Sequence, residues 1–140
     1  MKKITIIEII VVIIVLCALT MYLIPNIIAD REAKTLAIVK SNNAIYTSKV
    51  IEEFSHDKSA KPSDIAKKVA DELNKTQKNP YDNDKDFFSL DNELASCSNI
   101  EADDNLKMII VTTLDRQGEL ISRTVINPPS FVTYYKENEN

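Results

Sequence analysis

The chain begins with a long apolar segment and continues as a mostly polar sequence. Of the 21 residues from Ile4 to Ile24, 18 are apolar; the exceptions are Thr5, Glu8 and Thr20. A helix of this length reaches roughly 31 Å, which matches the hydrocarbon thickness of a bilayer. A helix also pairs its own backbone groups, as a segment in lipid must. The pattern therefore predicts a transmembrane helix over residues 4–25.

The helical pattern continues beyond the apolar run. Pro25 has no backbone N–H and kinks or ends a helix, but the following residues favour helix again, so we expect a kink within one long helix. Residues 26–57 form its amphipathic continuation, with apolar positions at helical spacing. These positions are Leu36, Val39, Tyr46, Val50 and Phe54, with Ile38 and Ile45 in a neighbouring row. Ser41-Asn42-Asn43 is a weak point, since these side chains compete for backbone hydrogen bonds.

The remaining residues, 58–140, indicate a small α+β domain. Its predicted elements are a helix over 62–75, opened by Pro62, and strands over about 107–114, 119–126 and 131–135. Gly118 suits the turn between the first two strands, and residues 76–105 look mainly like loop. We expect an α+β fold in which a long N-terminal transmembrane and amphipathic helix carries a small antiparallel β-sheet packed on it.

Composition narrows the classes of function. Lys and Arg number 17 against 21 Asp and Glu, a net charge of −4, and no basic stripe is present, so no direct nucleic-acid partner is expected. The single glycine, Gly118, excludes a Walker loop or a dinucleotide turn. His56, the only histidine, lies beside Asp57 in a polar segment and suits a surface position. Without a nucleophile–base pair or a metal cluster, we expect no enzyme.

The two cysteines fall in different environments. Cys17 lies in the predicted membrane segment and Cys97 lies outside it, so they cannot form an intramolecular disulfide. For Cys97 the sequence favours a buried free thiol, with pairing between subunits as the alternative.

Lys2 and Lys3 precede the apolar run, and positive charge stays on the cytoplasmic side of a membrane. The C-terminal domain is then extracytoplasmic. A cleaved secretory signal is disfavoured, because the apolar run is long and no small-residue cleavage site follows it. Glu8 has two interpretations: its side chain reaches up to the headgroups, or it pairs with a cation on a neighbouring helix and sets the register between subunits.

A wider pattern now joins these features. Thr5-Ile6-Ile7-Glu8, the Ile/Val run and Pro25-Asn26, with the proline 17 residues after the glutamate, resemble the N-terminus of type IV pilins and pseudopilins. The resemblance covers about residues 1–55. It implies a pilin-like fold, a leader (residues 1–3) removed by a prepilin peptidase, methylation of the new N-terminus at Ile4, and a role for Glu8 in assembly.

The chain departs from the family pattern at the leader junction. Lys3 stands where the family has glycine, and Ile4 where phenylalanine is usual. If that bond stays uncut, Glu8 has no free amine to meet, and Lys2 or Lys3 of a neighbouring subunit would take its place.

One loop carries a partial calcium-binding pattern. Asp82, Asp84, Asp86 and Glu93 match positions 1, 3, 5 and 12 of a calcium loop. Phe87 stands where that loop needs glycine, which favours a solvated acidic loop. The resemblance leaves calcium open, because several pseudopilins bind it in C-terminal loops; no other metal or cofactor is expected.

These expectations lead to one function and one alternative. The first is a pilin-like or pseudopilin-like structural subunit of a bacterial envelope filament: a type IV pilus, a type II secretion system or a competence-type system. Its partners would be other pilin-like subunits, as a homo- or hetero-oligomer, with an assembly platform at the inner membrane, and the assembled form could be an extracellular filament. The alternative is a single-pass anchored extracytoplasmic protein that binds a partner and does not polymerise.

Overall fold

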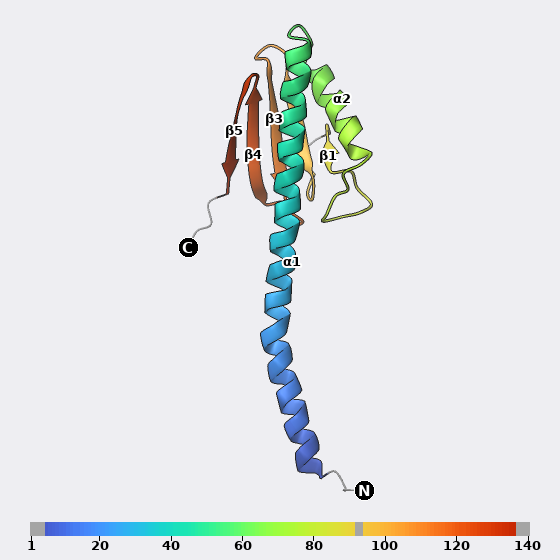
Figure 1. Ribbon diagram of the computed structural model, residues 1–140, viewed down its shortest axis with the longest axis vertical. Coiled ribbons are helices and arrows are strands. Elements are labelled where there is room, and N and C mark those ends of the chain that lie inside the picture. The colour runs from blue at the N-terminus through green and yellow to red at the C-terminus, as the bar shows by residue number, and fades with distance from the viewer. Residues whose placement is uncertain (1–4, 92–93, 137–140) are drawn as a thin grey trace. The chain divides into compact units, whose positions relative to one another are not determined.

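The computed structural model describes residues 5–91 and 94–136 (Figure 1). The chain divides into two compact units, residues 1–37 and 38–140. The first helix, α1 (Ile6–His56), runs through both and contains Pro25 in its interior. Proline removes one hydrogen-bond donor, in this helix the one that would reach the Met21 carbonyl, and the remaining turns keep their own bonds. The expected long apolar N-terminal helix of an α+β fold is confirmed.

Within residues 38–140, α1 buries one narrow stripe of side chains. Val39, Tyr46 and Val50 are fully buried, and Phe54 is 8% exposed. Their spacings of seven, four and four residues place them on one face of the helix. Ile38 and Ile45, on the neighbouring row, stay exposed. The stripe that faces the domain is therefore the one that the apolar spacing predicts.

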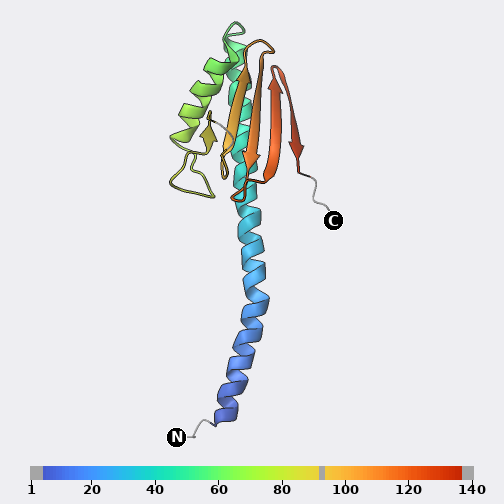
Figure 2. The same cartoon turned by 180° about the vertical axis from the view of Figure 1, so that it is seen from behind.

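In the described part of the chain, five strands form a single sheet in the order β1-β2-β3-β4-β5 (Figures 1 and 2). Their bounds are β1 (Phe88–Ser89), β2 (Ser98–Asp103), β3 (Met108–Leu114), β4 (Leu120–Asn127) and β5 (Ser130–Tyr135). β1 pairs with β2 in parallel, and all other neighbours pair antiparallel. The expectation of a purely antiparallel sheet is wrong: the sheet is mixed, because β2 runs in the same direction as β1.

β2 lies within residues 76–105, for which the sequence predicts mainly loop and no strand. Ile100 is the only strongly strand-favouring residue of β2, and two buried positions hold the polar Ser98 and Asn99. Polar side chains at buried positions hide the apolar periodicity that identifies a strand. Pairing with β3 along six residues, from Ser98↔Thr113 to Asp103↔Met108, makes this segment a strand.

The second helix, α2 (Pro62–Asn74), covers the β1–β2 side of the sheet. Its buried face holds Ile65, Ala66, Val69, Ala70 and Leu73. Its last residue, Asn74, is tied to β1: the amide Nδ2 donates to the Phe88 carbonyl (2.9 Å), and the Phe88 N–H donates to Oδ1 (3.0 Å). Figure 2 shows that the two helices of this unit lie on one face of the sheet.

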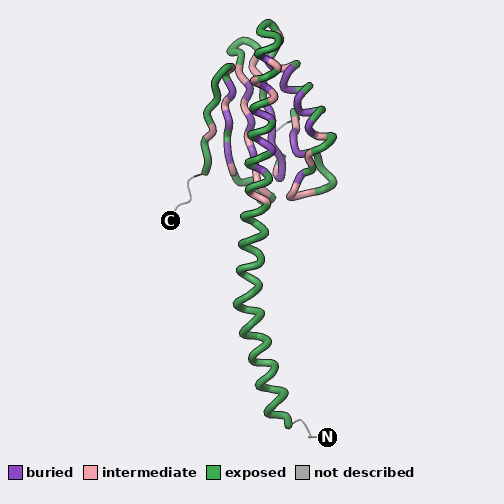
Figure 3. The backbone as a smooth tube through the Cα atoms, viewed as in Figure 1, coloured by how far each residue is buried: buried purple, intermediate pink, exposed green. Residues whose placement is uncertain are grey.

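An aromatic cluster joins the two helices to β1. The Tyr46 ring stacks on Phe88 at 4.8 Å, and Phe87 meets Phe88 edge-on at 4.7 Å. The Tyr46 hydroxyl donates to the Ala66 carbonyl in α2 (3.1 Å). Burial is concentrated in residues 38–140, as Figure 3 shows, and this core includes no residue before Val39 among those described.

Candidate functional site

The candidate site lies in the apolar part of α1. Every residue from Thr5 to Ala29 is exposed, and the large apolar side chains between Ile6 and Ile28 are about half exposed or more. An apolar surface all round a helix is stable only in lipid or against other proteins. Among the described residues, α1 is the one helix that is long and apolar enough to cross a membrane. The chain therefore has an N-terminal helix suited to a single membrane span.

Glu8 occupies the first turn of this helix. α1 begins at Ile6, so Thr5 is the residue that caps it and Glu8 is the third helical residue. The Thr5 N–H donates to Glu8 Oε2 at 2.8 Å. This bond is one half of a capping box, in which a glutamate satisfies a backbone N–H that the helix cannot. Glu8 also places negative charge at the positive end of the helix dipole.

The capping bond is a role for Glu8 that the sequence analysis missed. Its signal is the pattern Thr-x-x-Glu directly before an apolar helical run, which is visible in Thr5-Ile6-Ile7-Glu8. In the part of the chain that the structure describes, no cation forms an ion pair with Glu8. Glu8 is thus held within its own chain by a hydrogen bond and carries a charge that this bond does not neutralise.

The other polar groups in the apolar part of α1 are satisfied by their own helix. The Thr20 hydroxyl lies within hydrogen-bond distance of the carbonyls of Leu16 (3.0 Å) and Cys17 (2.9 Å). Asn26 Nδ2 donates to the Tyr22 carbonyl at 3.1 Å. None of these groups carries a charge. Glu8 is the single carboxylate between Thr5 and Ala29. It is therefore the acidic side chain in this segment that could form an ion pair with a cation outside its own chain.

After residue 29, α1 changes from apolar to charged residues. Lys34 Nζ lies 2.9 Å from Asp30 Oδ2, one helical turn away, and both side chains are well exposed. An exposed pair at this spacing contributes a few tenths of a kcal/mol to the helix. Pro25 thus stands between the apolar run and a solvated segment of one continuous helix. Lys3 and Ile4, the predicted leader junction, lie outside the described residues.

The structure does not gather the calcium candidates into a ligand shell. Asp82 Oδ1 accepts the Asp84 N–H at 3.1 Å, and its other oxygen lies 3.6 Å from Lys85 Nζ. Glu93 lies outside the described residues. Among the residues that are described, no three or more His, Cys, Asp or Glu side chains form a group that could hold a metal ion. Asp82, Asp84 and Asp86 therefore form a hydrogen-bonded loop with its own lysine counter-charge.

The remaining reactive side chains lie apart from one another. Cys97 is a buried free thiol whose Sγ contacts the Leu94 carbonyl at 3.3 Å, and burial raises its pKa. Cys17 is exposed on the apolar part of α1. His56 is exposed at the end of α1 and lies 3.9 Å from Glu52. A thiol held protonated by burial and a lone surface imidazole form no nucleophile–base pair.

Comparison of the chain with protein-family models, with curated proteins and with solved structures gave no match in any of the three. The class of the protein is therefore defined by its own architecture. It is an α+β protein whose N-terminal helix can span a membrane and whose C-terminal unit packs two helical segments on one face of a mixed five-stranded sheet.

Proposed function

We propose that the protein is a pilin-like or pseudopilin-like structural subunit of a bacterial envelope filament. The chain inserts in the inner membrane through α1, with its N-terminus cytoplasmic and residues 38–140 extracytoplasmic, and then joins other subunits of the same type. Support comes from the segment Thr5 to Glu8, the position of Pro25, and the order of elements after α1. The activity is association rather than catalysis.

The observation that carries this proposal is the exposed apolar surface of α1 with one carboxylate at its beginning. A plain anchor needs the apolar surface and an acceptor that caps α1 but gains nothing from the charge of Glu8, because a charged residue near hydrocarbon costs free energy. In a bundle of parallel helices the same carboxylate can meet a cation of the next subunit. The attraction is then strong because little water screens it, and it sets the axial offset between neighbours.

A second candidate is a single-pass anchored protein that binds an extracytoplasmic partner without polymerising. The hydrogen bond from Thr5 N–H to Glu8 Oε2 favours this candidate, because it lets Glu8 cap α1 without any contact to a second subunit. The two candidates differ in what they require of Glu8. The anchor needs only a hydrogen-bond acceptor, whereas the filament needs a negative charge.

Two substitutions separate these requirements. Glu8→Gln keeps an acceptor for the Thr5 N–H, since glutamine also completes a capping box, but removes the charge. Glu8→Ala removes both. We expect each variant to insert in the membrane and to lower incorporation into sheared or cross-linked filaments at least tenfold. Membrane fractionation and cross-linking of the full chain measure the two steps separately.

Glu32→Ala is the matched control. It removes an exposed carboxylate of α1 beyond the apolar run, where the described residues offer it no ion pair, and incorporation should stay unchanged. If Glu8→Gln assembles as well as the parent chain while Glu8→Ala does not, Glu8 acts in assembly as a helix cap and the proposed charge pairing is wrong. If the parent chain never forms neighbour cross-links, the filament proposal itself is wrong.

A further inference from the structure

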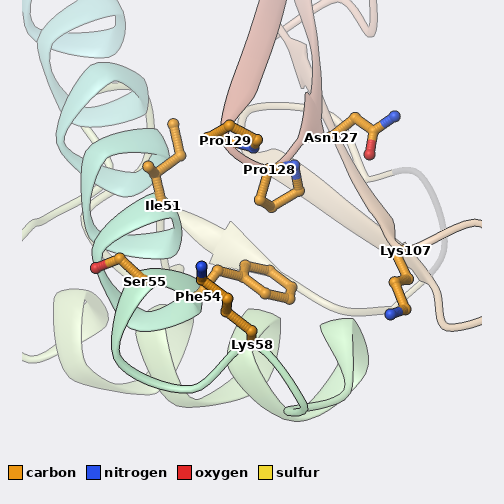
Figure 4. A pocket seen from close by; sticks show the side chains of 8 residues that line it. All are labelled: Ile51, Phe54, Ser55, Lys58, Lys107, Asn127, Pro128 and Pro129. Carbon is orange, nitrogen blue, oxygen red and sulfur yellow. The ribbon is translucent and has the colours of Figure 1, made fainter.

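A pocket of about 420 Å³ opens at the end of the domain where α1 finishes (Figure 4). Its apolar walls are Ile51 and Phe54 of α1 and the rings of Pro128 and Pro129, in the turn between β4 and β5. Lys58, in the turn after α1, and Lys107, in the turn between β2 and β3, also line it. All of these residues belong to the unit of residues 38–140, so the pocket is built within one compact body.

The two lysines give the pocket a chemical preference. Neither forms an ion pair with any described residue. The carboxylates nearest to these lysines in the sequence already accept other hydrogen bonds. Asp57, beside Lys58, accepts from Ser59. Before Lys107, Asp103 accepts from backbone N–H groups of its turn and Asp104 accepts from Ser63. Apolar walls beside two unpaired ammonium groups fit an apolar side chain that is followed or preceded by a carboxylate.

The same chain exposes a surface of this chemistry, which we call the leucine–aspartate patch (Leu90, Asp91 and Leu94). Leu90 is 43% exposed and Leu94 is 46% exposed. Asp91 uses its N–H to bond Ser89 Oγ (3.2 Å), and its carboxylate forms no ion pair with a described residue. Two exposed leucines beside a free carboxylate complement the pocket in both polarity and charge.

The patch cannot reach the pocket of its own chain. Leu94 N–H donates to Asn99 Oδ1 at 3.0 Å, and Asn99 pairs with Ser89, directly before Leu90, so Leu90 and Leu94 both lie near the beginning of β2. The pocket takes Lys107 from the turn that follows the end of β2. At about 3.3 Å per residue, the four residues from Asn99 to Asp103 alone separate the two by roughly 13 Å.

We propose that the pocket of one subunit receives the leucine–aspartate patch of a second copy of this chain, with Asp91 lying between Lys58 and Lys107. The contact joins two different surfaces, so it is head-to-tail and propagates instead of closing into a dimer. This inference rests on the proposed filament function, which holds copies side by side through α1 and so raises the effective concentration of a small contact.

The first experiment identifies the occupant of the pocket directly. A photo-reactive benzophenone amino acid replaces the exposed Ser55 at the pocket rim of the full-length chain, which is assembled together with an isotopically labelled copy. Irradiation followed by mass spectrometry should join position 55 to a peptide of the labelled copy that contains Leu90 and Leu94. Cross-links to another protein, to a small acid or to a different segment of this chain would overturn the proposal.

Charge reversal then tests the chemistry. Lys58→Glu should lower the yield of that cross-link at least fivefold, and adding Asp91→Lys to the same chain should restore it to within twofold. Lys67→Glu is the control, because Lys67 is exposed on α2 and has no ion pair with a described residue. A fall in yield that Asp91→Lys does not reverse contradicts the pairing.

A photo-reactive residue at Leu19, in the apolar part of α1, reports assembly independently. If copies cross-link through position 19 but not through the pocket, the contact proposed for the pocket is wrong and the filament proposal stands. If neither position gives a cross-link between copies, both proposals fail.

Discussion

Asn43 puts a hydrogen-bonding amide in the buried face of α1. Its Nδ2 donates to Thr113 Oγ1 (2.8 Å), its Oδ1 accepts the Ser98 hydroxyl (2.8 Å), and the two hydroxyls lie 2.8 Å apart. The three groups form a closed triangle that links α1 to β2 and β3. Leaving a buried polar group without a partner costs more free energy than its hydrogen bond contributes. Rotating α1 about its axis or sliding it along the sheet would break these bonds, so the triangle fixes the position of this part of α1.

Replacement of Asn43 tests this triangle. Asn43→Ala leaves Ser98 and Thr113 bonded only to each other, and we expect it to lower the free energy of unfolding by about 1–3 kcal/mol. Denaturant titration of the full chain in detergent measures the loss. Asn42→Ala is the matched control: Asn42 is similarly buried but makes no hydrogen bond through its side chain with the described residues, and its replacement should cost less than half as much. Equal losses would show that the triangle contributes nothing specific.

Asp104 makes stability depend on pH. Ser63 N–H donates to Oδ1 (2.9 Å) and Ser63 Oγ to Oδ2 (2.8 Å), so a carboxylate from the β2–β3 turn caps α2. These bonds lower the pKa of Asp104 below its ordinary value of 3.8. A lowered folded-state pKa stabilises the fold above the ordinary value, and this contribution disappears as the pH falls through the folded-state value.

We therefore expect Asp104→Asn to lower the melting temperature near pH 7 and to approach the parent chain below about pH 4. Thermal unfolding followed by circular dichroism between pH 7 and pH 2.5 measures the difference. Asp71→Asn, at an exposed position on α2 whose side chain has no hydrogen bond to the described residues, should track the parent chain at every pH. A difference for Asp104→Asn that stays constant with pH would contradict the linkage.

Single residues also show where the sequence is informative. The weak helical position at Asn42 and Asn43 is recognisable from residue type alone, but its use is not, because the partners Ser98 and Thr113 are 55 and 70 residues away. The cap at Glu8 is the opposite case. Donor and acceptor lie within four residues, so the pattern Thr5-x-x-Glu8 is enough to predict the hydrogen bond. Local hydrogen bonds can be inferred from spacing, whereas distant ones depend on the fold.

At the scale of elements, Tyr46 couples α1 to α2 and β1. Tyr46→Phe removes only the bond to the Ala66 carbonyl and should cost about 1 kcal/mol, since that carbonyl is also a helical acceptor. Tyr46→Ala also removes the ring that stacks on Phe88 and should cost about 3–5 kcal/mol. Denaturant titration of both variants separates the hydrogen bond from the packing. Similar losses for the two would show that the hydroxyl, not the ring, holds the helices together.

The elements differ in how far the sequence predicts them. β3 alternates intermediate and buried positions along Met108–Leu114, and β4 buries every second residue at Ser122, Thr124 and Ile126. Burial with a period of two is what a strand shows when one face of its sheet is covered. β5 is an edge strand whose residues remain largely exposed, and its β-branched and aromatic composition suffices to predict it. β1 has two residues and no pattern to detect, and the parallel pairing that makes the sheet mixed depends on it.

At the scale of the whole molecule, the two units are stabilised by different surroundings. Residues 38–140 contain the described hydrophobic core and the hydrogen bonds that join helices to sheet. The apolar part of α1 contributes no buried side chain to that core among the described residues, and an apolar helix of this kind is stable in lipid or against other proteins. A change in the apolar span should therefore alter insertion and assembly while leaving the folding of the domain intact.

Removal of residues 1–29 tests this separation. The shortened chain begins at Asp30, keeps the Asp30–Lys34 pair and every residue of the described core, and loses the exposed apolar surface. We expect it to remain in the soluble fraction without detergent and to unfold cooperatively within about 4 °C of the parent domain, a shift of less than about 1 kcal/mol for a unit of this size. Calorimetry and sedimentation measure both properties. A shortened chain that aggregates or melts without a transition would show that the apolar helix supports the domain, because residues 38–140 would then depend on contacts that their own core does not supply.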